Sequence, residues 1–314
     1  MTHASPHASH DHAAHATHQH GAHQHGADQH GADQHGADQH GADHDADGQA
    51  EILDLDAEVL AEHIASITAW LPVGADPRHI VDLGCGTGTG TFALLKRFPH
   101  AEVTAVDTSA GHLHRLLEKA TAEGLADRVN TVQADLDATW PDLGTPELVW
   151  ASASMHHMAD PDRALRQVRN TLAPGGLFAV VELAGFPRFL PENAPEERPG
   201  LEERCHAALA RHHAEHVPHR GADWGAKLTA AGFTVEAERT VTVNLGPPHA
   251  DAVGRYALSS LRRLRNGAAQ ALTAEDLGAL DRLLDTEGPH SILRRGDLTV
   301  RTERMVWAAT ASGG

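Results

Sequence analysis

The stretch that decides the fold is IVDLGCGTGTG, residues 80–90. An apolar run, His79–Leu83, leads directly into glycines at every second position, and Thr89–Phe98 then has the composition of a helix. Glycines between a buried strand and a helix let the backbone turn tightly and approach a ligand closely. We therefore expect a ligand at this turn; a tight turn without a ligand is the alternative.

The acids around this turn indicate a cationic ligand that contains adenosine. Asp82 stands two residues before the first glycine, where a carboxylate repels a pyrophosphate but attracts an amino group and a sulfonium. No Gly-Lys-Ser/Thr follows, so the turn is not a P-loop. Asp107 ends the second expected strand, where a carboxylate can accept both hydroxyls of a ribose. Asp135 ends the third, where its side chain can reach an adenine amino group.

On either side of the turn, apolar strands alternate with helices. The expected strands are His79–Leu83, Glu102–Val106, Arg128–Gln133, Glu147–Ala151 and Leu177–Leu183, and the expected helices are Thr89–Phe98, Ser109–Glu123, Pro161–Leu172 and Trp224–Ala231. Apolar strands separated by helices predict an α/β fold with a parallel sheet covered on both faces. Phe233–Val243 and Leu298–Thr310 alternate apolar and polar residues, which predicts two sheet-edge strands.

The remaining segments of the folded part, residues 49–314, are expected to be helical. Apolar residues from Leu55 to Leu71 recur at three- and four-residue steps, which predicts an amphipathic helix capped by Asp54 or Asp56. We interpret residues 49–75 as a lid over the ligand. Two further stretches, 185–223 and 247–296, are expected to be substrate-side insertions. Their helices are expected near Leu201–His216, Val253–Arg265 and Thr273–Asp285.

Five segments in this order carry a family resemblance: VDLGCGTGTGT, AVDTS, VQADLDATWP, LVWASASMHHMADPDRAL and LAPGGLFAVVEL. With them the chain resembles the class I S-adenosylmethionine-dependent methyltransferases, in particular the small-molecule branch found in ubiquinone and menaquinone biosynthesis. The resemblance is close from about Glu51 to Leu183 and looser towards the C-terminus.

The resemblance implies a Rossmann-like, doubly wound sheet of seven strands with an antiparallel last strand. It implies S-adenosyl-L-methionine as cofactor, with Gly84, Gly86 and Gly88 along it and Asp107 on the ribose. Asp135 would lie by the adenine, Leu136 against its ring, and Ser152 near the methionine end. The complete expected set of cofactor-binding residues is Asp82, Gly84, Cys85, Gly86, Gly88, Asp107, Thr108, Asp135, Leu136 and Ser152.

Methyl transfer is an in-line displacement, so a base helps only where the acceptor must lose a proton. His156 and His157 follow the fourth expected strand, at the edge where open α/β sheets bind ligands. They are the candidate catalytic residues, because an unperturbed histidine titrates near neutrality. We favour the alternative that the pair shapes the loop over the cofactor. The acceptor itself, a small molecule with an O-, N- or C-nucleophile, is not readable from the sequence.

Histidines also gather in the first insertion, at 206, 212, 213, 216 and 219. His212 and His216 are four residues apart on one helix face, a spacing that can bind a metal. No glutamate stands between them in the His-Glu-x-x-His arrangement, so we expect solvated histidines and no metal in the folded part. Two interpretations of Trp224 remain open: its side chain covers the acceptor, or it packs in the core.

Residues 1–48 have a composition of their own, with no Leu, Ile, Val or Phe. Five His-Gly-Ala repeats begin at His20, His25, His30, His35 and His40. Such a segment cannot bury apolar area, so we expect it to be disordered. Its imidazoles can bind Ni²⁺, Zn²⁺ or Cu²⁺ weakly and at many sites. An inert, solubilising extension is the alternative.

Charge and cysteine content exclude several classes of protein. Of 43 Asp and Glu, thirteen precede the first basic residue, Arg78, so the net charge of −18 lies mostly in the first quarter of the chain. No basic cluster suited to nucleic acid appears, since Arg262, Arg263 and Arg265 spread around one expected helix. Cys85 and Cys205 form no CxxC pair, which excludes a thiolate metal site. Lacking a signal peptide or membrane-length apolar run, the chain is expected to be cytoplasmic.

Two functional hypotheses from different classes remain. The first is the methyltransferase. The second is a metal-handling protein, in which the histidine-rich segment buffers Ni, Zn or Cu and the folded part is a scaffold. An NAD-dependent oxidoreductase is a distant third, because the single tyrosine, Tyr256, leaves no Tyr-x-x-x-Lys pair.

Overall fold

The computed structural model describes residues 48–216, 219–247 and 251–311, with the side chains of residues 211–216 left out. The described residues all belong to one compact unit. The repeat histidines predicted to bind metal lie outside the described residues. Among the described helices, none combines the length and the apolar character needed to cross a membrane.

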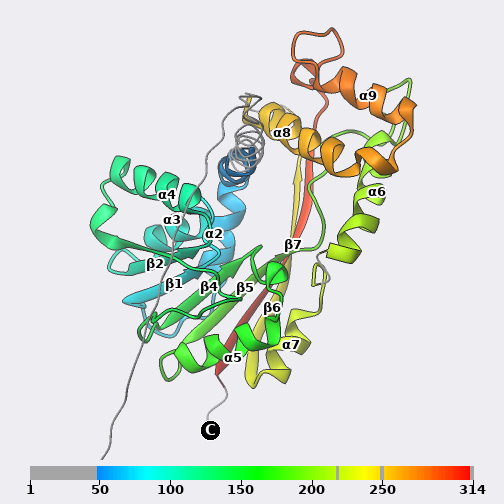
Figure 1. Ribbon diagram of the computed structural model, residues 1–314. Coiled ribbons are helices and arrows are strands. Elements are labelled where there is room, and N and C mark those ends of the chain that lie inside the picture. Colours follow the sequence, from blue (N-terminus) through cyan, green and yellow to red (C-terminus); the bar gives the residue numbers. More distant parts are fainter. Residues whose placement is uncertain (1–47, 217–218, 248–250, 312–314) are drawn as a thin grey trace, which may run out of the picture. The chain divides into compact units, whose positions relative to one another are not determined.

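Seven strands of the described residues form one sheet, in the order β3-β2-β1-β4-β5-β7-β6 (Figure 1). They are β1 (His79–Leu83), β2 (Glu102–Asp107), β3 (Val129–Gln133), β4 (Leu148–Ser152), β5 (Leu177–Leu183), β6 (Phe233–Leu245) and β7 (Val300–Ala311). The first five are parallel to one another, and β7 is antiparallel to both β5 and β6. The prediction of a seven-stranded sheet with an antiparallel last strand is confirmed.

Helices cover both faces of this sheet, as the apolar strands predicted. On one face lie α2 (Ala61–Trp70), α3 (Thr89–Arg97) and α4 (Ala110–Ala122), and on the other α5 (Pro161–Thr171) and α7 (Trp224–Ala230) (Figure 1). Successive residues of β1 serve opposite layers: Ile80 packs with the first group of helices and Val81 with the second. Ser109 caps α4, because its hydroxyl accepts the His112 N–H at 3.2 Å.

The prediction that Leu298–Thr310 is a sheet-edge strand is wrong. Within the described residues, β7 lies between β5 and β6, and only β6 stands at that end of the sheet. Three of its polar residues, Arg301, Thr302 and Glu303, belong to the part that extends past β5, since β5 pairs only with Arg304–Thr310. Beyond that point, residues 300–303 pair with β6, and Arg301 also forms an isolated bridge with Arg188.

The predicted N-terminal helix is present but begins earlier and is broken. Residues 48–59 are helical, a turn falls at Leu60, and α2 follows. The predicted caps are wrong, because Asp54 and Asp56 lie inside the first helical segment and bind side chains of other elements. The apolar face also starts earlier than expected, at Ala50, which is fully packed.

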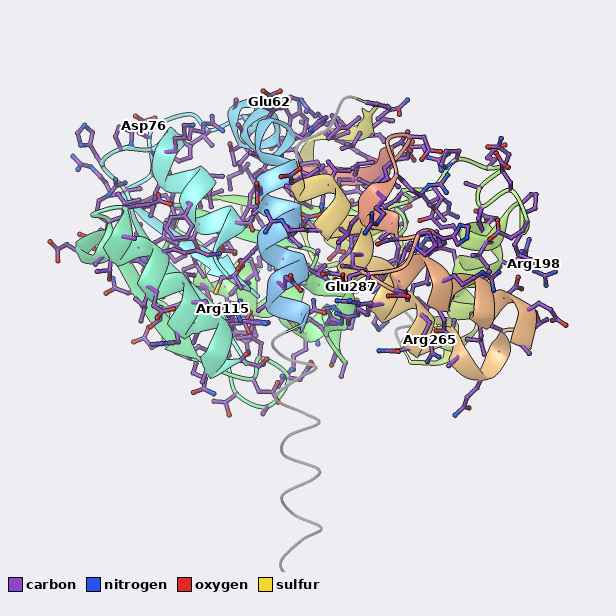
Figure 2. The ribbon with its side chains drawn as sticks, turned by 90° about the horizontal axis from the view of Figure 1, so that it is seen from above. Glu62, Asp76, Arg115, Arg198, Arg265 and Glu287 are labelled. Atoms are coloured by element: carbon purple, nitrogen blue, oxygen red, sulfur yellow. The ribbon has the colours of Figure 1, made fainter. Side chains whose placement is uncertain are left out.

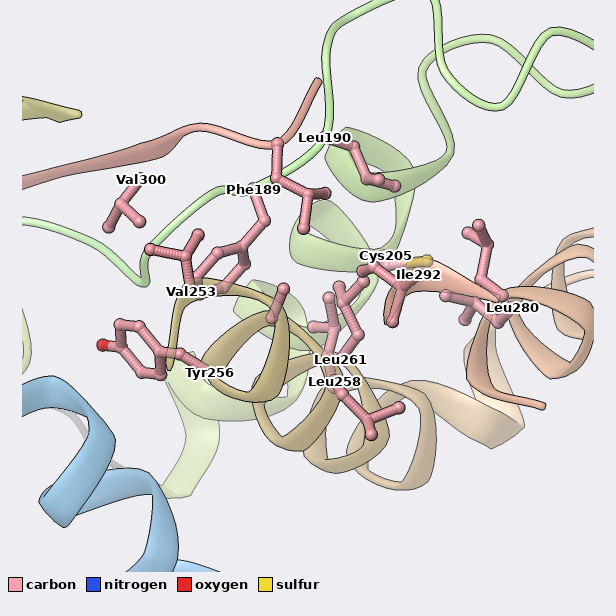
Figure 3. Packing of buried hydrophobic residues seen from close by; sticks show 14 of the residues in the cluster. Phe189, Leu190, Cys205, Val253, Tyr256, Leu258, Leu261, Leu280, Ile292 and Val300 are labelled. Atoms are coloured by element: carbon pink, nitrogen blue, oxygen red, sulfur yellow. The ribbon is translucent and has the colours of Figure 1, made fainter. Parts of the chain in front are cut away.

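The two insertions build a second core beside the sheet. Their helices are α6 (Leu201–His216), α8 (Asp251–Ala268) and α9 (Ala274–Leu284), which confirms the three predicted helices. Figure 3 shows the centre of this core, where the rings of Phe189 and Tyr256 meet edge to face at 5.0 Å. Leu55, Leu60 and Ile64 belong to the same cluster, so the N-terminal helices join the insertions to the sheet.

Candidate active site

The glycine-rich turn after β1 is held open by left-handed glycines and by the neighbouring strand. Gly84 has φ +67° and Gly86 φ +54°, values that side chains rarely adopt. The amides of Gly84 and Cys85 both donate to the Val106 carbonyl, at 2.8 and 3.0 Å. A Cβ on Gly84 would lie 2.4 Å from that of Ser154, so the turn passes too close to the loop after β4 for any side chain.

A cavity of about 330 Å³ opens above this turn at the carboxyl ends of the parallel strands. From β1, the turn, the ends of β2, β3 and β4 and the start of α4, its lining includes Asp82, Gly84, Cys85, Gly86, Thr87, Asp107, Thr108, His112, Asp135, Leu136, Ser152, Ser154, His157 and Met158. The N-terminal helices contribute Gln49, Leu53, Asp56 and Ile64, and β7 contributes Arg304. The cavity size is that of an ordinary small-molecule site.

The structure brings together almost all of the residues expected to bind the cofactor. Gly88 is the exception, because it does not line the cavity. It caps α3 with φ +97°, and a Cβ there would lie 2.8 Å from Phe92 and 2.9 Å from Leu116. Gly88 therefore serves helix packing under the turn, and the contact with the cofactor that the family resemblance implies stays a prediction.

Asp107 has three hydrogen-bond partners at the end of β2. Its carboxylate accepts the Gly86 N–H and the Ser109 N–H, both at 2.8 Å, and lies 3.3 Å from His112 Nδ1. Burial opposes its ionisation, but the bonds from His112, Ser109 and Gly86 outweigh that effect and lower the pKa of Asp107. The carboxylate is thus held ionised and in a fixed orientation at the end of β2.

Asp82 lies deeper, at the base of the cavity. It is 1% exposed and accepts a hydrogen bond of 2.7 Å from the Thr91 hydroxyl of α3. Desolvation raises the pKa of Asp82 to about 7, although the bond from Thr91 works in the opposite direction. A positively charged ligand in the cavity would favour the ionised form of this carboxyl.

The far end of the cavity lies beyond β3. Asp135 is exposed there and its carboxylate accepts the Asp137 N–H at 2.9 Å, while Leu136 beside it is buried and apolar. Arg163 of α5 holds this loop by donating to the carbonyls of Leu136 and Asp137, at 2.6 and 2.5 Å. An apolar wall next to an exposed acid suits the flat face and the amino edge of a nucleobase.

The two candidate catalytic histidines have different environments. Both belong to a short 3-10 helix, η2 (Met155–His157), that follows β4. His157 is exposed and lines the cavity. His156 is 2% exposed and its Nδ1 lies 2.5 Å from Glu182 Oε2 of β5. The structure thus brings only His157 to the cavity.

Ion pairs hold the first N-terminal helical segment over the cavity. On one side Lys119 of α4 binds Asp54 and also donates to the Thr87 carbonyl in the glycine-rich turn, at 3.1 Å. On the other side Arg304 of β7 donates to both oxygens of Asp56, at 2.8 and 2.7 Å. Viewed from above, this blue segment runs between α3 and α4 on one side and the gold α8 on the other (Figure 2).

Sequence reasoning missed several residues of the site. Gln49, Leu53 and Ile64 fit an amphipathic helix, and their pattern does not distinguish packing from contact with a ligand. Asp56 was predicted as a helix cap. Arg304 carried no separate signal, since it follows Arg301, Thr302 and Glu303 in the polar part of its strand, and only the structure shows that it is 3% exposed and needs a partner.

The predicted features of the first insertion have mixed outcomes. His206, expected to be solvated, is 9% exposed because α6 turns this face towards the second core, and burial lowers the pKa of His206 to about 4. The side chains of His212 and His216 lie outside the described residues. Trp224 is fully buried beneath α7 in the sheet core, which confirms the packing alternative. Among the described side chains, no three His, Cys, Asp or Glu residues gather as a metal site would require.

Comparison with known proteins places this site in a family. Residues 80–176 match the family model described as a methyltransferase domain. A trans-aconitate 2-methyltransferase of Acidovorax sp. (strain JS42) is 40% identical over 104 residues, which cover 33% of this chain and 38% of the relative. The enzyme of the same name from Methylobacterium nodulans is 33% identical over 187 residues, 57% of this chain and 66% of the relative.

Among solved structures, a putative methyltransferase from Bacillus halodurans superposes with a TM-score of 0.50. It is 16% identical, and the match covers 80% of this chain and 99% of the other, so it supports the fold alone. Several curated relatives are matched over only 30% to 42% of their own length. The family model, the strand order and the architecture nevertheless agree: residues 80–176 form the core of a class I S-adenosylmethionine-dependent methyltransferase domain.

Proposed function

We propose that the chain is an S-adenosylmethionine-dependent methyltransferase that transfers the methyl group to a small molecule by in-line displacement. The observation that carries this proposal is the cavity of Asp82, Asp107 and the glycine-rich turn. Asp107 offers an oriented carboxylate for a ribose, and Asp82 offers a second acid where a pyrophosphate would need donors. That combination suits a cationic adenosine cofactor and disfavours NAD.

The lining residues fit the parts of this cofactor in order along the cavity. Asp135 and Leu136 would hold the adenine, and Asp107 with Thr108 the ribose. The turn at Gly84, Cys85 and Gly86, together with Asp82 and Ser152, would hold the methionine portion. The bound cofactor would supply a methyl group on a sulfonium and a neutral leaving group.

The protein's contribution is then to align the acceptor and to exclude water. The helical segment of residues 48–59 closes one side of the cavity, and we propose that it acts as the lid. His157 stands beside the cavity and is the better placed of the two histidines to accept a proton from an acceptor that must lose one. Its alternative role, shaping the loop, needs no proton transfer.

The acceptor belongs to the class of small molecules, as the names of the relatives suggest. The two relatives described above are called trans-aconitate 2-methyltransferases, but their matches cover 33% and 57% of this chain. We therefore assign no named acceptor. The finer placement in the small-molecule branch of ubiquinone and menaquinone biosynthesis, which the motifs resemble, is also part of the proposal.

Calorimetric titration of the full chain with S-adenosylmethionine, S-adenosylhomocysteine and NAD⁺ tests the proposal. We expect both adenosyl sulfur compounds to bind with one site per chain and NAD⁺ to give no heat of binding. Binding of NAD⁺ without binding of either sulfur compound would refute the cofactor assignment.

A further inference from the structure

A buried polar cluster lies beside the cavity, at the carboxyl end of β5. It consists of Glu182, His156, Arg220 and the ring of Phe186, and we refer to it as the Arg220 cluster. Glu182 and His156 are 3% and 2% exposed. The cluster joins β5, the 3-10 helix after β4 and the loop before α7, and the proposed mechanism gives Arg220 no role.

Both carboxylate oxygens of Glu182 contact His156. One carboxylate oxygen accepts the backbone N–H of His156 at 3.2 Å, and the other lies 2.5 Å from its ring Nδ1. Because the carboxylate can only accept, Nδ1 carries the hydrogen and Nε2 of the neutral ring is an acceptor. That Nε2 faces Arg220 Nη2 at 3.4 Å. His156 therefore bridges Glu182 to Arg220 and positions the guanidinium.

Arg220 retains unused hydrogen-bond donors. Its Nε and Nη1 are buried and have no partner among the described residues, while its Cζ lies 4.1 Å from the centre of the Phe186 ring. A guanidinium stays charged in proteins, and leaving charged donors buried without acceptors is costly. The ring stacking fixes the plane of the guanidinium but accepts none of these N–H bonds. A ligand can therefore provide the acceptor that these donors lack.

The electrostatics around Arg220 also suit an anion. Burial lowers the pKa of Arg220, the carboxylate of Glu182 raises it, and a second cation, Arg263 of α8, lowers it further. An oxyanion beside Arg220 would offset both the burial of the guanidinium and the repulsion from Arg263.

The position of the cluster relates it to the methyl acceptor. Ligands of open α/β sheets bind at the carboxyl ends of the strands, where β4 and β5 end here. The ring centres of His156 and His157 are 4.1 Å apart, and His157 lines the cavity. His156 and His157 therefore lie between Arg220 and the cavity. Arg220 is on the side where the two insertions pack.

We infer that Arg220 binds a carboxylate of the methyl acceptor, so that the acceptor is a small organic acid. Glu182 and His156 are positioning residues for this contact, and Phe186 orients the guanidinium plane. The inference rests on the proposed function for the identity of the ligand as acceptor, but the anion site itself can be tested without the cofactor.

The test is equilibrium binding of mono-, di- and tricarboxylic acids, their neutral methyl esters and inorganic phosphate to the full chain. Wild type is compared with R220Q, with R220K and with R166Q, which removes the same charge from an exposed position of α5. S-adenosylmethionine affinity is measured in parallel for each variant. We expect at least one acid to bind wild type and R166Q equally, and its ester to bind at least about tenfold more weakly.

R220Q should lose about tenfold or more in affinity for that acid while S-adenosylmethionine binds as in wild type. R220K, which keeps the charge but loses the planar fork, should fall between the two. If R220Q does not fold, R220K decides: an affinity for the acid equal to that of wild type would overturn the inference.

The inference is also overturned if no carboxylic acid binds wild type, if phosphate alone binds, or if acid and ester bind alike. Failure of the cofactor proposal looks different. In that case the acid would bind in an Arg220-dependent manner while S-adenosylmethionine does not bind at all. Cofactor binding without acid binding would overturn the Arg220 inference and leave the methyltransferase proposal intact.

Discussion

Asp107 combines two tasks in one carboxylate. It fixes the glycine-rich turn by accepting the Gly86 N–H at 2.8 Å, and it presents its remaining lone pairs to the cavity. A carboxylate that is already oriented by the protein loses little entropy when it binds a ligand, which makes it an effective ribose acceptor.

Replacing Asp107 by Ala should weaken S-adenosylmethionine binding. Two ribose hydroxyls lose their acceptor, a cost of roughly 1–3 kcal/mol, which corresponds to about tenfold or more in Kd. Calorimetry of the variant measures the Kd, and circular dichroism checks that the fold is kept. An unchanged Kd in a folded variant would contradict the assignment of this residue.

Asp82 should make cofactor binding depend on pH. Its pKa of about 7 in the folded chain lies above the ordinary 3.8, so near pH 6 the group is mostly protonated. A cationic ligand favours the ionised form and must displace that proton. S-adenosylmethionine affinity should therefore rise by about tenfold between pH 6 and pH 8, with proton release at the lower pH.

The matching variant is Asp82→Asn, in which no carboxyl titrates. Its affinity should be lower at pH 8 and should change little between pH 6 and pH 8. Isothermal titration in two buffers of different ionisation enthalpy measures the proton release. Parallel pH profiles of wild type and variant would show that Asp82 does not meet the cofactor's charge.

Among the elements, the segment of residues 48–59 is held over the cavity by buried apolar residues and by polar contacts at several points, of which Asp54 provides one. Lys119 anchors Asp54 to α4, whereas Glu58 pairs with Arg255 at the surface, at 3.3 Å. The Asp54 contact lies against the glycine-rich turn through the Thr87 carbonyl, so losing it should loosen the lid where it meets the cofactor.

We expect Asp54→Ala to accelerate S-adenosylmethionine dissociation by roughly twofold to fivefold, since half-exposed ion pairs are modest in energy. Association should change little. Glu58→Ala is the matched control, because it removes one exposed carboxylate from the same helix without touching the cavity. Stopped-flow displacement gives both rates, and equal dissociation rates in the two variants would contradict the lid.

The sequence is most informative where local chemistry and structure coincide. β1 and β5 begin and end where apolar runs meet polar residues or glycines, and Asp107 can be placed because it ends a strand. Gly88 lies outside the cavity lining, and a glycine pattern alone does not reveal which glycine faces a ligand. Contacts between distant segments are unreadable: Asp56 and Arg304, which meet at the cavity, stand 248 residues apart.

The same limit explains the position of β7 and the Arg220 cluster. An alternating pattern fits a strand at the edge of a sheet, and it also fits an interior strand that extends beyond its neighbour. Only the observed pairing of β7 with β5 decides between the two. Glu182 is a polar residue in the most apolar strand, which signals that a buried partner is needed. The sequence does not identify that partner as His156. The position of His156 after β4 indicates a candidate catalytic base instead.

At the scale of the whole molecule, the histidine-rich segment and the folded part should act separately. Thirteen histidines lie in residues 1–44, and near pH 7 most imidazoles are neutral and able to bind a borderline metal, whereas near pH 5 they are protonated. We propose weak, multi-site metal binding by this segment, with no role in the transfer step.

Titration of Zn²⁺ into the full chain and into a chain that starts at Gln49, at pH 7.5 and pH 5.5, tests this separation. The full chain should take up several ions at the higher pH and few at the lower, and the shortened chain should take up none. Equal uptake by both chains would place the metal in the folded part, with His212 and His216 as the first residues to substitute.

The central claim, methyl transfer to a small molecule, is tested most directly with methyl-labelled S-adenosylmethionine and a metabolite extract. The account predicts that S-adenosylhomocysteine forms only when extract is present, and that an equal amount of label appears in a small organic acid. Asp107→Ala should reduce both together. Label in protein or nucleic acid, or no turnover by a chain that binds the cofactor, would contradict the account.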